Sequence, residues 1–229
     1  MNASKFQVIQ NHTDTEHKSR ATFEYACFMS YRQTRTGEVP PLVQKLFENL
    51  SEEITDFWEK EIFLDRERLR AGDRYNEILA CKLCKSVCMI AVYTPVYFHE
   101  QHTYCAREYY AMQQLEKTRL QGLPKSEQEK GLIIPIVLKG EEFLPLEVKS
   151  CRQYYNFESY ALGGLRGNNM SYRKELRNIV KYILDRHRAF SKLDFDPCRF
   201  CTAFRFPTDQ EIRPWLRGVL GPQNKFERQ

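Results

Sequence analysis

Short apolar runs alternate with longer amphipathic stretches from Tyr25 onward. The run YACFMSY at 25–31 is almost continuously apolar, as expected of a strand that is covered on both faces of a sheet. Four further strands are predicted by the short apolar runs at 61–64, 88–94, 132–138 and 153–157. Because strands that alternate with helices form parallel βαβ units, the pattern predicts a doubly wound α/β domain with a five-stranded parallel sheet flanked by helices.

The stretches between the predicted strands carry apolar residues at helical spacing. The first such stretch follows Pro40 and Pro41, which favour a helix start. Helices are predicted over 43–58, 74–87, 103–120 and from 176 to about 190. Pro135 fits its strand badly, since proline donates no hydrogen bond within a sheet, and its strand is therefore predicted near an edge or locally irregular.

The two ends of the chain depart from this alternation. Residues 1–23 are polar and lack the apolar core and cleavage site of a secretory signal. Residues 191–229 are aromatic and rich in arginine, but they have no sustained period and are too few to hold a core of their own. They are too apolar for a disordered tail, so this C-terminal extension is expected to pack on the α/β domain at 24–190 or on a partner.

Length and charge exclude several classes of protein. The 229 residues suffice for one domain with an appendage. The formal net charge is +5, and basic residues are mixed with acidic ones, which argues against a dedicated nucleic-acid-binding protein. The longest apolar runs are shorter than the roughly 20 residues that cross a bilayer, so no membrane span is predicted. Without an export signal, we expect a cytoplasmic protein.

The eight cysteines are expected to be free thiols, because disulfide frameworks belong to exported proteins. Cys81, Cys84 and Cys88 are spaced as one buried helix face and are predicted to lie in the core. Cys198 and Cys201 form half of a zinc-binding pattern. Packing is the predicted role of this pair, although Cys81 and Cys84 could complete the zinc site.

Two other patterns give little support to a chemical role. His99, His102 and Cys105 bring metal-ligand types together, but their spacing is not that of a His-Glu-x-x-His motif, and no metal is predicted. The segment GGLRGNN at 163–169 matches neither a P-loop nor a dinucleotide-binding fingerprint, so it is predicted to be a flexible turn. No Ser-His-Asp arrangement can be inferred.

The stretch YCAREYYAM at 104–112 places a carboxylate within an apolar helix face. Cys105, Tyr109 and Met112 recur at helical spacing, and Glu108 falls among them. An acid in the first turns of a helix can simply complement the helix dipole, by about 0.3–1 kcal/mol. Alternatively, Glu108 faces the crevice at the carboxyl ends of the strands, where open parallel sheets bind ligands.

Four segments, in order, resemble the characteristic boxes of the Toll/interleukin-1 receptor (TIR) domain family. They are FMSYR (28–32), FLDRERLRAGDRYNEIL (63–79), MIAVYTPVYF (89–98) and YCAREY (104–109). Each box is short, but four in order with compatible spacing make the resemblance specific. It covers about residues 24–190 and implies the flavodoxin-like TIR fold.

The resemblance also implies an enzyme that cleaves NAD⁺. Enzymatic members carry a Trp-Cys-x-x-Glu pattern on the third helix, and the glutamate cleaves the bond between nicotinamide and ribose. Here the pattern begins with Tyr104 in place of Trp and ends on Glu108, which is therefore the expected catalytic residue. By this resemblance NAD⁺ is the substrate rather than a cofactor. A carboxylate beside the ribose can stabilise an oxocarbenium-like transition state, so no cofactor or metal is required.

Residues in the loops that follow the first three strands are implied to bind the substrate. By resemblance, Tyr31 and Arg32 lie against the dinucleotide, where a ring can stack on a base and a guanidinium can grip pyrophosphate. Asp65, Leu69 and Gly72 match the BB loop, which in the family borders the site and contacts neighbouring subunits. The expected substrate-binding residues are Ser30, Tyr31, Arg32, Asp65, Leu69, Gly72, Tyr97, Tyr104 and Cys105.

A standalone protein of this type resembles components of innate immunity, including bacterial antiviral systems. Cleavage would deplete NAD⁺ or produce a signal derived from ADP-ribose, and assembly with other TIR subunits into an oligomer or filament would activate it. A separate sensor or effector protein is an expected partner. The alternative is a noncatalytic TIR adaptor that assembles through its BB loop and helix faces, and such an adaptor has no need of a carboxylate at Glu108.

Overall fold

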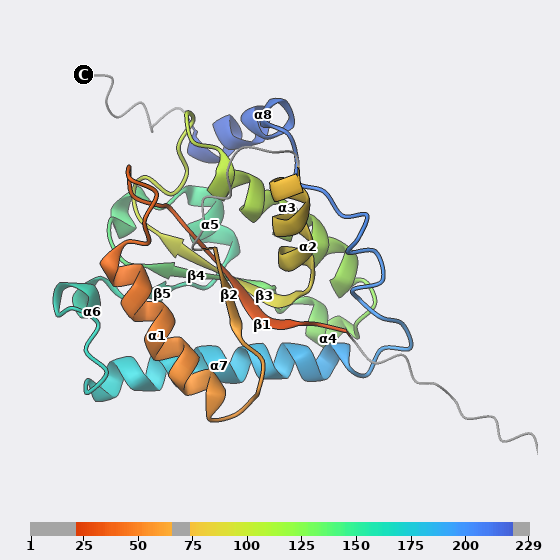
Figure 1. Cartoon of the computed structure of the whole chain (residues 1–229), viewed down its shortest axis with the longest axis horizontal. Helices are drawn as coiled ribbons and strands as arrows, with labels where there is room; N and C mark the ends of the chain where they lie inside the picture. Colours follow the sequence, from red (N-terminus) through yellow and green to blue (C-terminus); the bar gives the residue numbers. More distant parts are fainter. Residues whose placement is uncertain (1–21, 66–73, 222–229) are drawn as a thin grey trace, which may run out of the picture.

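Five parallel strands form the centre of the protein in the order β2-β1-β3-β4-β5 (Figure 1). The computed structural model describes residues 22–65 and 74–221. The strands are β1 (Tyr25–Tyr31), β2 (Ile62–Leu64), β3 (Ser86–Tyr93), β4 (Ile133–Val137) and β5 (Tyr155–Asn156). This topology confirms the predicted doubly wound α/β fold with a five-stranded parallel sheet, and the strand order is the flavodoxin-like one.

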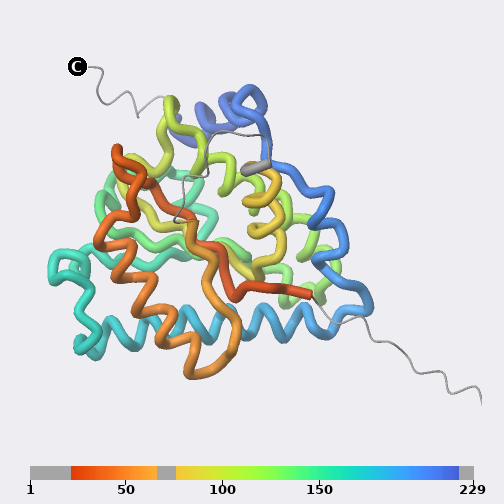
Figure 2. The backbone as a smooth tube through the Cα atoms, in the orientation of Figure 1, coloured from red at the N-terminus to blue at the C-terminus, as the bar shows by residue number. Residues whose placement is uncertain are grey.

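Helices cover both faces of the sheet (Figures 1 and 2). The main ones are α1 (Pro41–Thr55), α2 (Arg74–Cys84), α3 (Tyr104–Leu120) and α7 (Met170–Phe190). Helices α1 and α7 contact each other on one face, and α2 and α3 contact each other on the other. Because α2 ends at Cys84, the prediction of one helix face with Cys81, Cys84 and Cys88 was wrong: Cys88 lies in β3, where it is buried as a strand residue.

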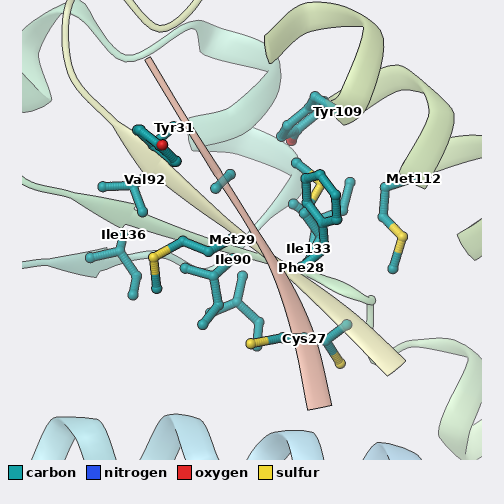
Figure 3. Close-up of a cluster of buried hydrophobic side chains, with 14 of the residues drawn as sticks. Cys27, Phe28, Met29, Tyr31, Ile90, Val92, Tyr109, Met112, Ile133 and Ile136 are labelled. Atoms are coloured by element: carbon teal, nitrogen blue, oxygen red, sulfur yellow. The ribbon is translucent and has the colours of Figure 1, made fainter. Parts of the chain in front are cut away.

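Strands β1 and β3 are central and almost entirely buried, which is why their sequences are apolar without alternation. Successive side chains of β1 point to opposite faces of the sheet. Figure 3 shows Phe28 on the side of Met112 and Tyr109 of α3, whereas Met29 and Ile90 lie toward α7. By the same alternation, Ser30 faces α3.

Strand β4 tolerates its proline because of where β5 begins. Pro135 lies opposite Ala91 of β3, but the two-residue β5 pairs only with Ile136 and Val137. The prediction that this strand lies near an edge is therefore confirmed. The stretches predicted as connections contain short helices: α4 (Lys125–Gln128), the 3₁₀ helix η1 (Glu141–Phe143), α5 (Leu146–Cys151) and α6 (Glu158–Leu162).

The C-terminal extension packs back on the domain, as expected, and forms α8 (Asp209–Leu220) against α3. The interpretation that this extension has no helical period was wrong. Thr208 and Glu211 form a reciprocal capping box, which is a recognisable helix start, and Ile212, Leu216 and Val219 are buried on one face. Pro214 inside the helix obscured this signal.

The expectation that all cysteines are free was also wrong. Cys84 at the end of α2 and Cys201 in the extension form a disulfide across 117 positions of sequence. The other six cysteines are free thiols. Among the described residues, no helix combines the length and apolarity that a membrane span requires.

Candidate functional site

Glu108 lies at the carboxyl edge of the sheet, where β1, the loop after β3 and α3 meet. The hydroxyl of Ser30, the second-last residue of β1, donates to Glu108 Oε2 at 2.5 Å. The same Ser30 oxygen lies 2.7 Å from the hydroxyl of Tyr97, which follows β3. An ionised carboxylate only accepts hydrogen bonds, so in that state Tyr97 donates to Ser30 and Ser30 donates to Glu108.

The carboxyl of Glu108 is almost enclosed, with 8% of the residue exposed. Burial raises its pKa to about 8, and the charge of Asp65 adds to the rise. The Ser30 hydrogen bond and the charge of Arg107 act in the opposite direction. No ion pair to Glu108 forms within the described parts of the chain. The neutral acid therefore predominates at pH 7 in the free protein.

The helix-dipole explanation for Glu108 does not fit this geometry. Helix α3 begins at Tyr104 and has no acidic residue in its first turn, so Glu108 is the fifth helical residue. Its carboxyl binds a side chain of β1 rather than a free amide at the helix start. The carboxylate in the apolar face is thus explained by the contact with Ser30.

The predicted neighbours of Glu108 on α3 separate into two groups. Cys105 and Tyr109 are buried, as the apolar stripe indicated. Tyr104 is 51% exposed, and the guanidinium of Arg107 lies 5.4 Å from the centre of its ring. Tyr104 is thus an accessible aromatic surface one turn before Glu108, available to stack on a planar ligand.

The other predicted substrate-binding residues gather at the same edge only in part. Tyr31 ends β1, and its hydroxyl donates to the backbone carbonyl of Asp65, the residue that follows β2. Burial raises the pKa of Tyr31, and the negative charges of Asp65 and Glu108 contribute to that rise. Arg32 is half-buried, and its charge acts on Cys105. Leu69 and Gly72 lie outside the described residues.

Arg107 was missed by the sequence reasoning. It is buried, its charge lowers the pKa of Glu108, and its Nε donates to the carbonyl oxygen of Pro207 at 2.6 Å. Thr103, one helical turn before Arg107, donates to Asp209 of α8 at 2.5 Å. The only sequence signal was a basic residue next to the glutamate, because the partner of Arg107 lies 100 positions away.

The other candidate sites are a possible metal site, the pair His99 and His102, and one surface hollow. In residues 22–65 and 74–221, no three His, Cys, Asp or Glu side chains are grouped so as to hold a metal ion. The rings of His99 and His102 lie 5.4 Å apart, and His99 Nδ1 accepts a hydrogen bond from the Gln101 amide. One hollow formed by described residues lies on the first turns of α7, lined by Met170, Ser171, Arg173, Lys174, Arg177 and Asn178.

Comparisons with known proteins identify no relative of this chain. No family model, no curated protein and no solved structure matches this chain. The activity of the site is therefore inferred from its own geometry and from the four sequence segments.

Proposed function

We propose that this protein is a TIR-type NAD⁺ glycohydrolase or cyclase in which Glu108 is the catalytic residue. The observation that carries the proposal is a buried carboxyl at the carboxyl edges of β1 and β3, held by Ser30 and without an ion-pair partner in the described structure. The TIR assignment itself rests on the four boxes at 28–32, 63–79, 89–98 and 104–109. Ligands of open parallel sheets bind at this edge.

The charge state of Glu108 suits a cationic substrate. The nicotinamide ring of NAD⁺ is positively charged, and a positive charge beside a carboxyl favours the ionised form and lowers its pKa. As the bond from ribose C1′ to nicotinamide breaks, its electron pair goes to the nicotinamide nitrogen, and positive charge develops on the ribose. Ionised Glu108, held by Ser30, would stabilise that charge.

The second half of the reaction needs no protein nucleophile. Water attacks C1′ and loses a proton to give ADP-ribose, or another acceptor gives a cyclic isomer or a conjugate. Either outcome removes NAD⁺ and can create a nucleotide signal. Tyr104, Tyr31 and Arg32 are the proposed residues for stacking on the dinucleotide and gripping its pyrophosphate.

The burial of Glu108 implies that this edge opens before the substrate binds. We attribute the opening to assembly with other TIR subunits. We propose that the protein acts in the cytoplasm, in innate antiviral immunity. A separate sensor or effector protein would be its partner. The same burial favours the alternative function, a noncatalytic TIR scaffold. In that alternative, Glu108 is only a hydrogen-bonded part of the domain interior.

The deciding experiment is nicotinamide release from NAD⁺, followed by chromatography and mass spectrometry, at increasing protein concentration. We expect wild type to turn over and Glu108→Gln to lose at least about 100-fold of that rate while it remains folded. Glu100→Gln, which alters an exposed acid before α3, is the matched control and should retain full turnover.

Two results would contradict the catalytic proposal. One is equal turnover in wild type and Glu108→Gln. The other is a wild type that assembles, as light scattering reports, yet leaves NAD⁺ intact at every concentration. The second result would establish the scaffold.

A further inference from the structure

The disulfide between Cys84 and Cys201 is surrounded by unusual neighbours. All its atoms lie in buried residues, and the thiol of Cys198 is buried beside it, with its sulfur 3.8 Å from the carbonyl oxygen of Cys84. One guanidinium nitrogen of Arg119 lies 3.7 Å from the sulfur of Cys84 and 4.0 Å from the sulfur of Cys198. Three sulfur atoms and one buried cation therefore share a small region.

Arg119 carries a buried charge. The Asp196 carboxylate acts on that charge from a distance, and the guanidinium carbon lies 5.0 Å from the centre of the Phe23 ring. The residue is 3% exposed, its guanidinium donates to the backbone carbonyls of Cys84 and Ser86, and its Nε has no hydrogen-bond partner among the residues that the structure describes. Within the described residues it makes no ion pair with a carboxylate. A buried cation is stabilised by a neighbouring anion, and a thiolate at Cys198 or Cys84 would place one in contact with the guanidinium, in addition to the more distant Asp196.

The disulfide fastens the extension at one end of α3. From Cys198 and Cys201, near Arg119 in the last turn of α3, the extension continues to Pro207 and Asp209, which bind Arg107 and Thr103 at the start of that helix. Figure 2 shows this segment passing from the end of α7 alongside the α2 and α3 face to α8. Its attachment therefore affects the helix that carries Glu108.

We propose that Cys84, Cys198 and Cys201 form a redox-active exchange site that thiol reductants use to release the extension. The Cys198 thiolate attacks the sulfur of Cys84, a Cys84–Cys198 bond forms, and Cys201 leaves with the electron pair and takes up a proton. A thiol reductant, either one dithiol or two monothiol molecules, then supplies two electrons and two protons, is itself oxidised to a disulfide, and leaves all three cysteines as thiols.

Arg119 has a defined part in this exchange. Its charge stabilises the attacking thiolate of Cys198, whereas the charge of Asp196 opposes that thiolate. Burial still raises the pKa of Cys198 to about 11, which keeps the exchange slow while the segment is closed. Local opening of the extension, which has no regular secondary structure between α7 and α8, provides the faster route. This inference does not depend on NAD⁺ cleavage.

The test uses the full-length protein, glutathione or dithiothreitol as the reductant, and alkylation followed by mass spectrometry of the linked peptides. In oxidised wild type we expect the Cys84–Cys201 link. In Cys201→Ser we expect a Cys84–Cys198 link in its place. In Cys198→Ser the original link should persist and be reduced at least about tenfold more slowly than in wild type. Cys151→Ser, which changes an exposed cysteine on α5, is the control and should match wild type.

Hydrogen–deuterium exchange provides the second readout. On reduction, amides of 199–220 should exchange several-fold faster, while those of β3 should not change. The proposal would be overturned by a free Cys198 in oxidised Cys201→Ser, by equal reduction rates in wild type and Cys198→Ser, or by unchanged exchange in 199–220. Stoichiometric zinc in the reduced protein would also overturn it, in favour of a metal site.

Discussion

Helix α3 carries two acids that are withdrawn from solvent to different degrees, Glu108, which is buried, and Glu116, which is partly buried, and they are in opposite electrostatic situations. Arg152 binds Glu116 through two nitrogens, at 2.9 and 2.6 Å, and the amide of Leu132 donates to the same carboxylate. Glu108, two turns earlier, receives a hydroxyl hydrogen bond from Ser30. Within the described residues, Glu116 forms an ion pair and Glu108 does not.

The difference separates an acid with a cationic partner from one that, under the proposed function, is available for chemistry. A bidentate arginine compensates the loss of hydration of Glu116, so that pair joins α3 to the end of α5 and has no charge left to offer. Gly131 makes room for the pair, because a Cβ there would lie 2.6 Å from Glu116 Oε1. For Glu108, burial without a cation instead raises the pKa, which leaves the charge to be recovered when a cationic group arrives.

The largest expected effect is on stability, in Glu116→Gln. This change leaves the Arg152 guanidinium largely buried without its carboxylate, so the free energy of unfolding should fall by about 3–5 kcal/mol. Urea denaturation at pH 7 measures it, with Glu100→Gln as the exposed control. A loss below about 1 kcal/mol would show that the two acids of α3 are not as different as the contacts indicate.

Glu108→Gln should have the opposite sign and depend on pH. The folded-state pKa of about 8 lies above the unfolded value of about 4.5, so the folded protein holds a proton that the unfolded chain releases between these values. Wild-type stability contributed by Glu108 therefore falls as the pH rises from about 4.5 to 8. The variant should be more stable than wild type by roughly 1–4 kcal/mol at pH 9 and nearly equal to it at pH 4.5.

Unfolding curves at pH 4.5, 7 and 9 check this prediction. Equal stability of the two proteins at all three pH values would contradict the raised pKa of Glu108. A variant less stable than wild type at pH 9 would show that the ionised carboxylate is compensated in the folded state, as that of Glu116 is.

The smallest predicted effect is a shift in the pH profile of NAD⁺ cleavage. Because kcat/KM reports the free protein, it should fall about tenfold per pH unit below pH 8, where Glu108 is protonated. Ser30→Ala removes a hydrogen bond that stabilises the carboxylate, so the midpoint should move upward by about one pH unit. A pH profile that is flat from pH 6 to 9, or that does not move in Ser30→Ala, would show that ionisation of Glu108 does not control the reaction.

Most of the sheet and its flanking helices could be predicted because burial leaves local marks. Continuous apolar runs predicted β1 and β3, and apolar residues at helical spacing predicted α3 and α7. The extension shows the limit of that reasoning. Helix α8 has a capping box and an apolar face, but Pro214 and a short length weakened the period.

The sequence indicated which residues belong to the candidate site better than it indicated which of them contact each other. The position of Glu108 in an apolar stripe indicated that it would meet the sheet, and the strand order placed it at the carboxyl edge. Its hydroxyl partner was one of several candidates in the first box. Arg107 escaped notice altogether, because its tether to Pro207 belongs to a segment whose packing had no local signal.

By itself, the amino-acid sequence determined the fold class, the main elements and the helix face on which Glu108 lies, since these depend on spacings of a few residues. Only the tertiary structure decided which groups meet: Ser30 with Glu108 across 78 positions, and Cys84 with Cys201 across 117. It also decided that, in the part of the chain that the structure describes, Glu116 has an arginine partner and Glu108 has none. The reason is physical, because pairing and desolvation depend on distances in space, which the order of strands and the packing of helices create.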